Sequence, residues 1–317
     1  RRPVFDWAAQ PPARPAFTGV RVVEPALEEL IPFIDWTFFF HAWELRGRFP
    51  AILDHPQMGP SARELYDNAT AMLRRLVDGG RLRARGAYAF WPAAADGDDI
   101  VLFTDEGRGT ELHRFAMLRQ QRQKEDGKPM YSLADFVAPG DAGVPDWVGG
   151  FAVTAGLGVD ELAAEFTAQH DDYSAIMVKA LADRMAEAFA EMLHQRARRD
   201  WGIEPDEVSA EDLVEERYRG IRPAFGYPAC PDHTPKRALF DLLGAPALGI
   251  TLTEHLAMLP TASVSGLYFS HPQSRYFAVG PVDAEQLDDY APRAGMSADD
   301  ARRWLSPNLQ HDAEVTA

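Results

Sequence analysis

The chain has 317 residues and 46% of them are hydrophobic, so it can form one large domain or two ordinary ones with a sizeable core. Its formal net charge of −16 argues against a nucleic-acid partner, because binding to a phosphate backbone requires a basic face. No apolar run approaches the roughly 18 residues that a membrane-spanning helix needs, and the first residues lack the apolar core of a signal peptide.

Positive charge nevertheless clusters in two regions. The first consists of Arg74, Arg75, Arg81, Arg83 and Arg85, and the second of Arg196, Arg198 and Arg199. One interpretation is a set of solvated helix ends. The other is a docking patch for an acidic partner protein.

The N-terminal region begins with residues 1–18, which are rich in Pro and Arg and are expected to form an arm or linker. We expect a domain at 19–317, with a short helix at 25–33. Ser61-Ala-Arg-Glu64 has the pattern of a capping box, and apolar residues follow it at helical spacing. That helix is expected to end at Gly79-Gly80.

Short runs of strand-forming residues follow. They lie at 86–92, 99–104 and 110–117, and near the end of the chain at 264–270 and 275–280. Because short turns join the members of each group, we expect antiparallel hairpins.

The longest helical pattern runs from Asp172 to Arg199. Its predicted buried stripe consists of Ile176, Met177, Leu181, Met185, Phe189, Met192 and Leu193. Further helices are expected at 210–218, at 235–244, and after the caps Asp283 and Ser297. Hairpins interspersed with helices, without steady β-α-β alternation, predict an α+β fold. We expect a single large domain with a twisted antiparallel sheet and flanking helices.

Residues 220–234 form a stiff loop that reads Gly-Ile-Arg-Pro-Ala-Phe-Gly-Tyr-Pro-Ala-Cys-Pro-Asp-His-Thr. Its prolines restrict the backbone, and Gly226 permits a positive φ or a close backbone approach. The loop offers Arg222 as a carboxylate clamp and Tyr227 as an aromatic face. S-adenosylmethionine suits it, because that molecule has a carboxylate, a cation and a planar base. The alternative is a Pro-rich turn between two helices, with Arg222 in a plain salt bridge.

The Arg-x-x-x-Gly-Tyr signature of this loop stands in a Pro-Ala-Cys-Pro context. Other segments accompany it in order, among them Ile34-Asp35-Trp36-Thr37, Leu133-Ala-Asp-Phe-Val-Ala-Pro139, Phe151-Ala-Val-Thr-Ala-Gly-Leu-Gly158 and Tyr268-Phe-Ser-His-Pro272. Over about residues 15–310 the chain resembles the activation domain of cobalamin-dependent methionine synthase. The resemblance implies an S-adenosylmethionine-binding reactivation domain. Such a domain supplies the methyl group for reductive methylation of cob(II)alamin in methionine biosynthesis.

The resemblance also implies a set of ligand-binding residues. They are Asp35, Glu187, Arg222, Ala224, Gly226, Tyr227, Tyr276 and Phe277. Arg222 is expected to hold the methionine carboxylate, and Asp35 or Glu187 the α-amino group. The chain departs from the family pattern at Phe38 and Phe225, where Pro is usual. Phe225 bears on the shape of the adenosine pocket and therefore on affinity.

Four of these residues also have structural interpretations. Asp35 has the position of a helix cap, and Glu187 has the spacing for an ion pair with Arg184. Tyr276 and Phe277 alternate on a predicted strand, so at least one of them is expected to lie in the core.

We expect no catalytic acid or base, because methyl transfer from a sulfonium is an in-line displacement. The protein then needs only to bind the sulfonium and orient it. Cys230-Pro-Asp-His233 has the spacing of half a metal site. The chain has no second cysteine and no supporting His pair, so we expect no metal in it. His233 is instead expected to hold the loop by a hydrogen bond.

The resemblance implies partners as well. Cobalamin is expected in a neighbouring domain or chain, zinc in another domain of the full enzyme, and a flavodoxin-like protein as electron donor. The isolated chain would not run the full methionine synthase reaction. With a single cysteine and no disulfide framework, the expected location is the cytoplasm. The alternative from a different class is a non-catalytic docking module with a vestigial ligand site.

Overall fold

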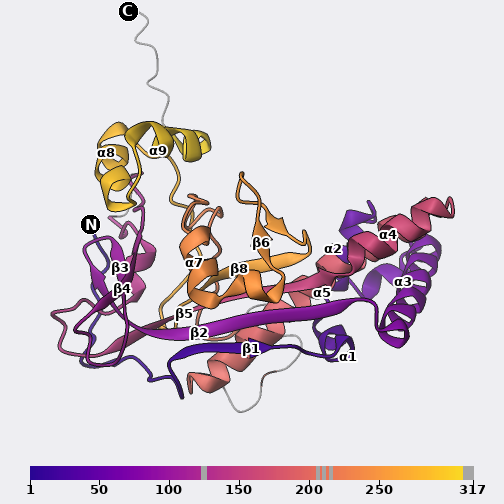
Figure 1. Ribbon diagram of the computed structural model, residues 1–317, viewed down its shortest axis with the longest axis horizontal. Coiled ribbons are helices and arrows are strands. Elements are labelled where there is room, and N and C mark those ends of the chain that lie inside the picture. The colour runs from indigo at the N-terminus through magenta and orange to yellow at the C-terminus, as the bar shows by residue number, and fades with distance from the viewer. Residues whose placement is uncertain (123–126, 205–207, 209–211, 214–216, 310–317) are drawn as a thin grey trace, which may run out of the picture.

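The computed structural model describes residues 1–122, 127–204, 208, 212–213 and 217–309. The helix expected at 210–218 lies largely outside these residues. Within them, an open antiparallel sheet of six strands runs along the long axis of the molecule (Figure 1). Its strands are β1 (Gly19–Val23), β2 (Arg83–Asp96), β3 (Asp99–Phe103), β4 (Glu111–Ala116), β5 (Asp146–Leu157) and β8 (Ser263–Tyr268). The predicted α+β class with an antiparallel sheet is confirmed.

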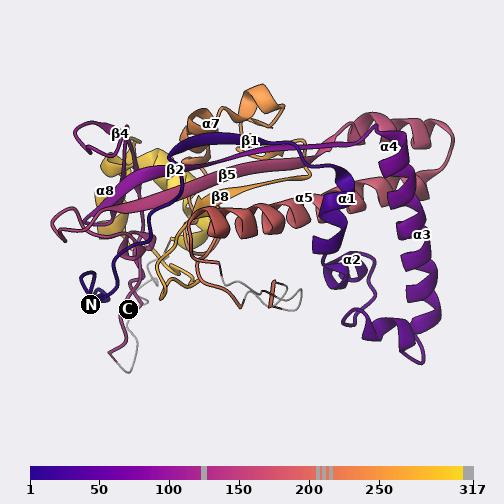
Figure 2. The same ribbon diagram turned by 90° about the horizontal axis from the view of Figure 1, so that it is seen from below.

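The two longest strands, β2 and β5, form the middle of the sheet. The order is β4-β3-β2-β5-β8, and β1 pairs with the same edge of β2 as β3 does, but further towards the start of β2. A small separate ribbon consists of β6 (Thr251–Leu252) and β7 (Met258–Leu259). Seen from below, α5 (Asp172–Asp200) runs along one face of the sheet (Figure 2).

Alternation along β2 divides the core into two layers. Tyr88 and Phe90 point to the layer that contains α5. Ala87, Ala89 and Trp91 point to the opposite layer, which contains α7 (Lys236–Leu243). The middle of the sheet is therefore buried on both faces. In this part of the sheet, β5 and β8 carry residues of the candidate ligand-binding site described below.

The remaining helices cover the two ends of the sheet (Figure 1). One end holds α1 (Leu27–Leu30), α2 (Trp36–Ala42), α3 (Gly59–Gly79) and α4 (Val159–Ala168). The other end holds α8 (Ala284–Arg293) and α9 (Ala298–Trp304), which enclose a core of their own. The caps expected at Asp283 and Ser297 are confirmed, since their side chains accept backbone N–H groups of Gln286 at 2.8 Å and Asp300 at 3.1 Å.

Several expectations need correction. Helix α3 begins at Gly59 with Pro60 in its first turn, so Ser61-Glu64 is inside the helix and is not a capping box. Residues 275–280 form no strand, and β8 pairs with β5 instead of a hairpin partner. Ile176 is 58% exposed and does not belong to the buried stripe of α5.

Strand β5 escaped prediction because Gly149 and Gly150, two of its three glycines, weaken an apolar pattern. A Cβ on Gly149 would lie 2.9 Å from the Tyr268 side chain, and one on Gly150 would lie 2.8 Å from the Trp91 ring. The glycines thus allow large aromatic residues of the neighbouring strands to pack over the middle of the sheet.

The N-terminal arm packs against the domain, although residues 1–18 contain no helix or strand. The Trp201 indole donates to the carbonyl of Ala13 at 2.9 Å, and the Ala16 amide donates to Asp200 at 2.7 Å. Nearer the N-terminus, the ring centroids of Phe5 and Trp7 lie 4.3 and 4.8 Å from the ring centroid of His271. These contacts anchor the arm at several points.

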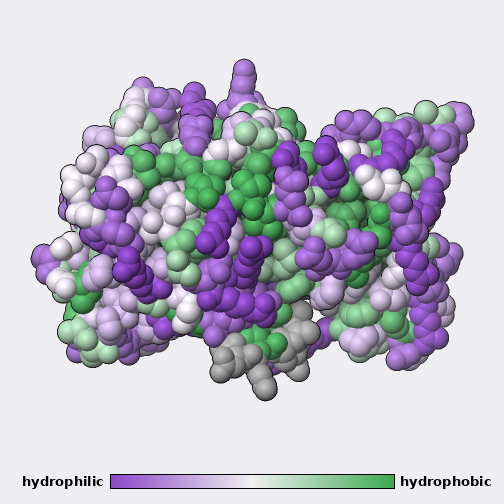
Figure 3. Space-filling view, turned by 60° about the horizontal axis from the view of Figure 1, so that its bottom comes forward, coloured by the Kyte–Doolittle hydropathy of each residue, from purple (hydrophilic) through white to green (hydrophobic). Residues whose placement is uncertain are grey.

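On the surface, the face in Figure 3 shows hydrophobic areas separated by hydrophilic side chains. The basic cluster around residues 74–85 is partly neutralised. Arg81 forms two hydrogen bonds with Glu165, at 2.5 and 2.6 Å, and Arg85 pairs with Glu24 at 2.6 Å. No helix in the described part of the chain is long and apolar enough to cross a membrane.

Candidate ligand-binding site

A cavity of about 600 Å³ opens between α5, the loop after Ile221 and strand β8. Six of the eight predicted site residues line it, namely Glu187, Arg222, Ala224, Tyr227, Tyr276 and Phe277. Its volume lies within the range of about 300–1,000 Å³ that is usual for small-molecule sites. Residues that are up to 90 positions apart in the chain therefore meet in one place.

The backbone of the Pro-rich loop is fixed by β8 and by the segment that follows it. Ile221 and Phe269 exchange two backbone hydrogen bonds of 3.1 Å, and the Leu267 amide donates to the Pro223 carbonyl at 2.9 Å. The amide of Arg222 donates to the phenol oxygen of Tyr276 at 3.0 Å. The loop and Tyr276 thus form one unit.

Inside the loop, Gly226 has a φ of 88°, as its place in the sequence predicted. The Gly226 amide donates to the Cys230 carbonyl at 2.8 Å, and the Cys230 thiol donates to the Ala224 carbonyl at 3.0 Å. Burial raises the pKa of this thiol well above its ordinary value, so Cys230 stays protonated and acts as a structural donor.

The side chain of Arg222 is 16% exposed and has several partners within the protein. Its guanidinium lies 2.7 Å from Oε2 of Glu191, 2.5 Å from the hydroxyl of Tyr218 and 3.2 Å from Nδ1 of His194. The salt bridge that the alternative interpretation expected is therefore present. It coexists with a position in the lining of the cavity.

Glu187 lies one helical turn before Glu191 on α5 and is exposed at the cavity. No hydrogen bond or ion pair joins Glu187 to any residue that the structure describes, so the expected pair with Arg184 is absent there. A carboxylate in this state is available to a positively charged ligand group.

Aromatic side chains frame the opening. Tyr227 is 62% exposed and Tyr276 is 47% exposed. Phe277 is half-buried, with its ring centroid 5.9 Å from that of Tyr131. Phe225 lines the cavity from within and packs in the core against Phe115. The site therefore offers a charged pair and exposed aromatic faces together.

The other two predicted residues stand outside the lining. Asp35 caps α2, since its carboxylate accepts the amides of Thr37 at 2.9 Å and Phe38 at 3.4 Å. Gly226 supports the loop through its backbone. A direct ligand contact by either residue remains a prediction.

Sequence reasoning missed Glu191, His194, Tyr218 and Lys236. Glu187, Glu191 and His194 lie at spacings of four and three along α5, so helical periodicity places them on one face. Their spacing relative to Glu187 was therefore a signal in the sequence that could have identified Glu191 and His194 as site residues. No sequence pattern indicated Tyr218 or Lys236, because only tertiary packing brings them to the site.

Lys236 is an unusual component of the lining because it is buried. Its ammonium lies 2.9 Å from Nδ1 of His233 and donates to the Leu256 carbonyl at 3.0 Å. Burial lowers the pKa of Lys236, and burial together with the charge of Lys236 lowers the pKa of His233. The expected hydrogen bond of His233 is thus made with Lys236.

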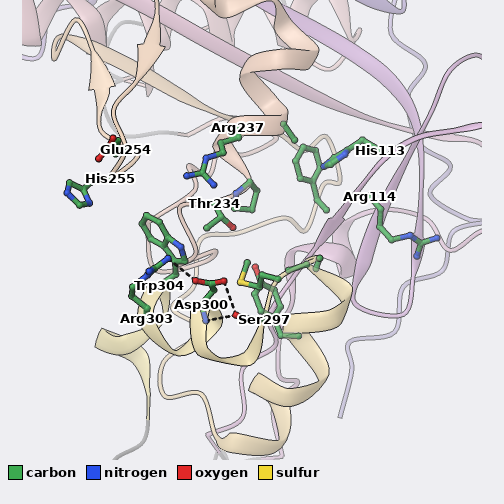
Figure 4. A pocket seen from close by; sticks show the side chains of 18 residues that line it. His113, Arg114, Thr234, Arg237, Glu254, His255, Ser297, Asp300, Arg303 and Trp304 are labelled. Carbon is green, nitrogen blue, oxygen red and sulfur yellow. Dashed lines mark hydrogen bonds and ion pairs between the residues drawn. The ribbon is translucent and has the colours of Figure 1, made fainter.

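A second cavity, of about 850 Å³, lies between α7, β4 and the α8–α9 end of the molecule (Figure 4). Some of its charged groups already have partners, whereas no hydrogen bond or ion pair joins the side chain of Arg237 or Glu254 to a residue that the structure describes. Asp300 accepts from Ser297 and from Arg303, both at 2.8 Å. Arg114 is paired with three acidic residues outside this cavity. None of the eight predicted site residues lines this larger cavity, so the smaller cavity is the better candidate for the predicted ligand.

No group of three or more His, Cys, Asp or Glu side chains in the described ranges could hold a metal ion. Cys230 and His233 are each engaged in the loop contacts described above.

Two comparisons with known proteins show the family of this chain. A family model described as "Vitamin B12 dependent methionine synthase, activation domain" matches residues 26–295. The chain is also similar to a crystal structure of the MetH reactivation domain bound to AdoHcy, with 49% sequence identity and a TM-score of 0.96. That similarity covers 98% of this chain and 96% of the other. The chain therefore belongs to the activation-domain family of vitamin B12-dependent methionine synthase.

Proposed function

We propose that the cavity beside Arg222 binds S-adenosylmethionine and presents its methyl group to cobalamin held by a neighbouring domain. The observation that supports this most is the meeting of the Arg222 guanidinium and the Glu187 carboxylate in one cavity. An α-amino acid carries a carboxylate and an ammonium, so it complements both groups. AdoHcy, which the similar MetH domain binds, is S-adenosylmethionine without the transferred methyl group.

The existing ion pair between Arg222 and Glu191 is compatible with ligand binding. A ligand carboxylate would share the guanidinium with Glu191, Tyr218 and His194, which lie 2.7, 2.5 and 3.2 Å from it. The pair does reduce the net charge that a ligand meets. Affinity in this proposal therefore depends on the orientation of Arg222 and on Glu187 as well as on charge.

The chemistry that the protein must supply is positional. In an in-line displacement the S–CH3 bond breaks, its electron pair stays on sulfur, and no proton is moved. Reduced cobalamin, when present, accepts the methyl group. The residues of this chain bind the amino acid end and expose the sulfonium near Tyr227 and Tyr276, whose ring faces favour a cation.

The electron that precedes this transfer requires a donor, and we propose a small acidic protein of the flavodoxin type. The basic cluster at residues 74–85 is the docking patch we assign to it. Because Arg81 and Arg85 are already ion-paired, steering would depend on the other arginines. An association rate that does not fall with rising salt would contradict this patch.

Ligand-dependent stability tests the binding proposal. At a concentration of about one hundred times the Kd, S-adenosylmethionine should stabilise the protein by about 2.7 kcal/mol. Glu187→Gln should reduce this stabilisation, whereas Glu161→Gln, an exposed change on α4, should not. Absence of any stabilisation of the unsubstituted chain would favour the docking module with a vestigial site.

A further inference from the structure

Arg222 is held by residues from two different parts of the chain. Glu191 and His194 come from α5, and Tyr218 comes from the segment just before the Pro-rich loop. The contacts to the guanidinium nitrogens measure 2.5–3.2 Å, and Arg222 still lines the cavity. Such an arrangement restricts a side chain that otherwise has large rotamer freedom.

His194 contributes an acceptor without a charge. Its burial is complete, and the nearby positive charges of Arg222 and Arg198 add to that effect, so the pKa of His194 lies well below its ordinary value. Because a guanidinium can only donate, Nδ1 of His194 must accept this hydrogen bond. The ring lies parallel to that of Tyr268, with centroids 5.0 Å apart, and this stacking restricts the plane of the imidazole.

Tyr218 joins the two ends of the ion pair. Its hydroxyl accepts from Arg222 at 2.5 Å and donates to Oε2 of Glu191 at 3.4 Å. The guanidinium of Arg198 lies 3.6 Å from the centre of the Tyr218 ring and holds the ring in place. The position of the hydroxyl is therefore supported by the ring contact as well as by Arg222 and Glu191.

We infer that Tyr218, His194 and Glu191 are positioning residues that aim the Arg222 guanidinium at the carboxylate of the ligand. This inference rests on the proposed function, and it names the part of the ligand that these residues control. They should matter for ligands with an α-carboxylate and not for analogues without one. A purely structural role would weaken the binding of both kinds of ligand equally.

The decisive variant is Tyr218→Phe, which removes one hydroxyl and keeps the ring. Tyr173→Phe is the matched control, because it removes the hydroxyl that accepts from Asn68, near the start of α5 and outside the cavity lining. Both variants and the unsubstituted chain are titrated calorimetrically with S-adenosylmethionine and with its decarboxylated form. The decarboxylated form keeps the adenosine, the sulfonium and the amino group.

We expect Tyr218→Phe to weaken binding of S-adenosylmethionine about tenfold, as for loss of a hydrogen bond to a charged group. Binding of the decarboxylated form should stay within about twofold, and Tyr173→Phe should change neither affinity. Unchanged affinity for S-adenosylmethionine, or equal loss for both ligands, overturns the positioning role while the proposed function stands. A chain without substitution that binds neither ligand overturns both.

If Tyr218→Phe does not fold, substitutions of His194 decide the matter. Asn at this position keeps an acceptor near the place of Nδ1, and Leu removes it. The inference requires that His194→Leu lose affinity for S-adenosylmethionine and that His194→Asn retain more of it. Equal affinities of the two variants overturn the inference.

Discussion

The imidazole ring of His233 fills the space beside the backbone of Gly226, so that a Cβ on residue 226 would lie 2.0 Å from the ring. The backbone of Gly226 also has a φ of 88°. The ring cannot simply turn away, because its Nδ1 lies 2.9 Å from the buried ammonium of Lys236. Glycine is therefore required twice at this position, once by the backbone and once by the neighbouring ring.

Gly226→Ala should lower the free energy of unfolding by about 3 kcal/mol, because a strained φ and a steric clash act together. Gly80→Ala is a suitable control, since Gly80 has a φ of 58° with open space around its Cβ position. That variant carries only the backbone strain and should lose about 1 kcal/mol. Urea denaturation measures the free energy of unfolding of both variants. Equal losses would show that the contact with His233 does not contribute to the effect of Gly226→Ala.

Arg222→Ala should weaken binding of S-adenosylmethionine by about tenfold or more, the value of a charge-assisted contact. It should also reduce stability by about 3 kcal/mol, because Glu191 loses its partner in a site where it is only 12% exposed. Calorimetry on the folded variant measures the first effect. Arg63→Ala, which removes an exposed ion pair with Asp54, is the control and should leave ligand affinity unchanged.

Acid should destabilise the protein through His271, which is 4% exposed. Burial, with repulsion from Arg219, lowers the pKa of this residue to about 4 from 6.5. Between those values the unfolded chain binds more protons than the folded one, so stability falls as the pH falls from 6.5 towards 4. The loss at the acid end is about 3 kcal/mol.

Asp146 acts in the opposite direction, because burial raises its pKa to about 7 and favours the folded state as the pH falls. A comparison with His271→Asn separates the two effects, since Asp146 contributes equally to both proteins. The stability advantage of His271 over Asn should therefore shrink by about 3 kcal/mol between pH 7.5 and pH 4. Parallel stability curves for the two proteins would contradict the assignment.

Removal of residues 1–15 should lower the unfolding free energy by about 2–4 kcal/mol, because it uncovers the apolar contacts of Phe5 and Trp7 and breaks the hydrogen bond from Trp201 to Ala13. Thermal unfolding measures the change. A free linker would give no change, and that result would contradict the docked position of the arm.

The sequence could predict the features that depend on local chemistry. The positive φ of Gly226 follows from its place in a Pro-rich loop, and the length of α5 follows from its apolar period. The caps Asp283 and Ser297 follow from short-range patterns. Each of these features is decided within a few residues of the chain.

Features that depend on distant partners escaped prediction. The glycines of β5 are needed by Trp91 and Tyr268, which lie on other strands. The partners of Arg222 are likewise set by tertiary packing, since Tyr276 is 54 positions away and His194 is 28 positions away. Periodicity along α5 could have placed Glu191 on the same face as Glu187, but it could not show that Glu191 contacts an arginine of the loop.

The measurement that tests the account most directly is a crystal structure of this chain with S-adenosylmethionine. The account predicts the ligand in the cavity of about 600 Å³, with its carboxylate within hydrogen-bonding distance of Arg222 and its ammonium beside Glu187. A ligand bound only in the cavity beside Arg237 and Trp304, or a cavity at Arg222 that stays empty at saturating ligand, would contradict it.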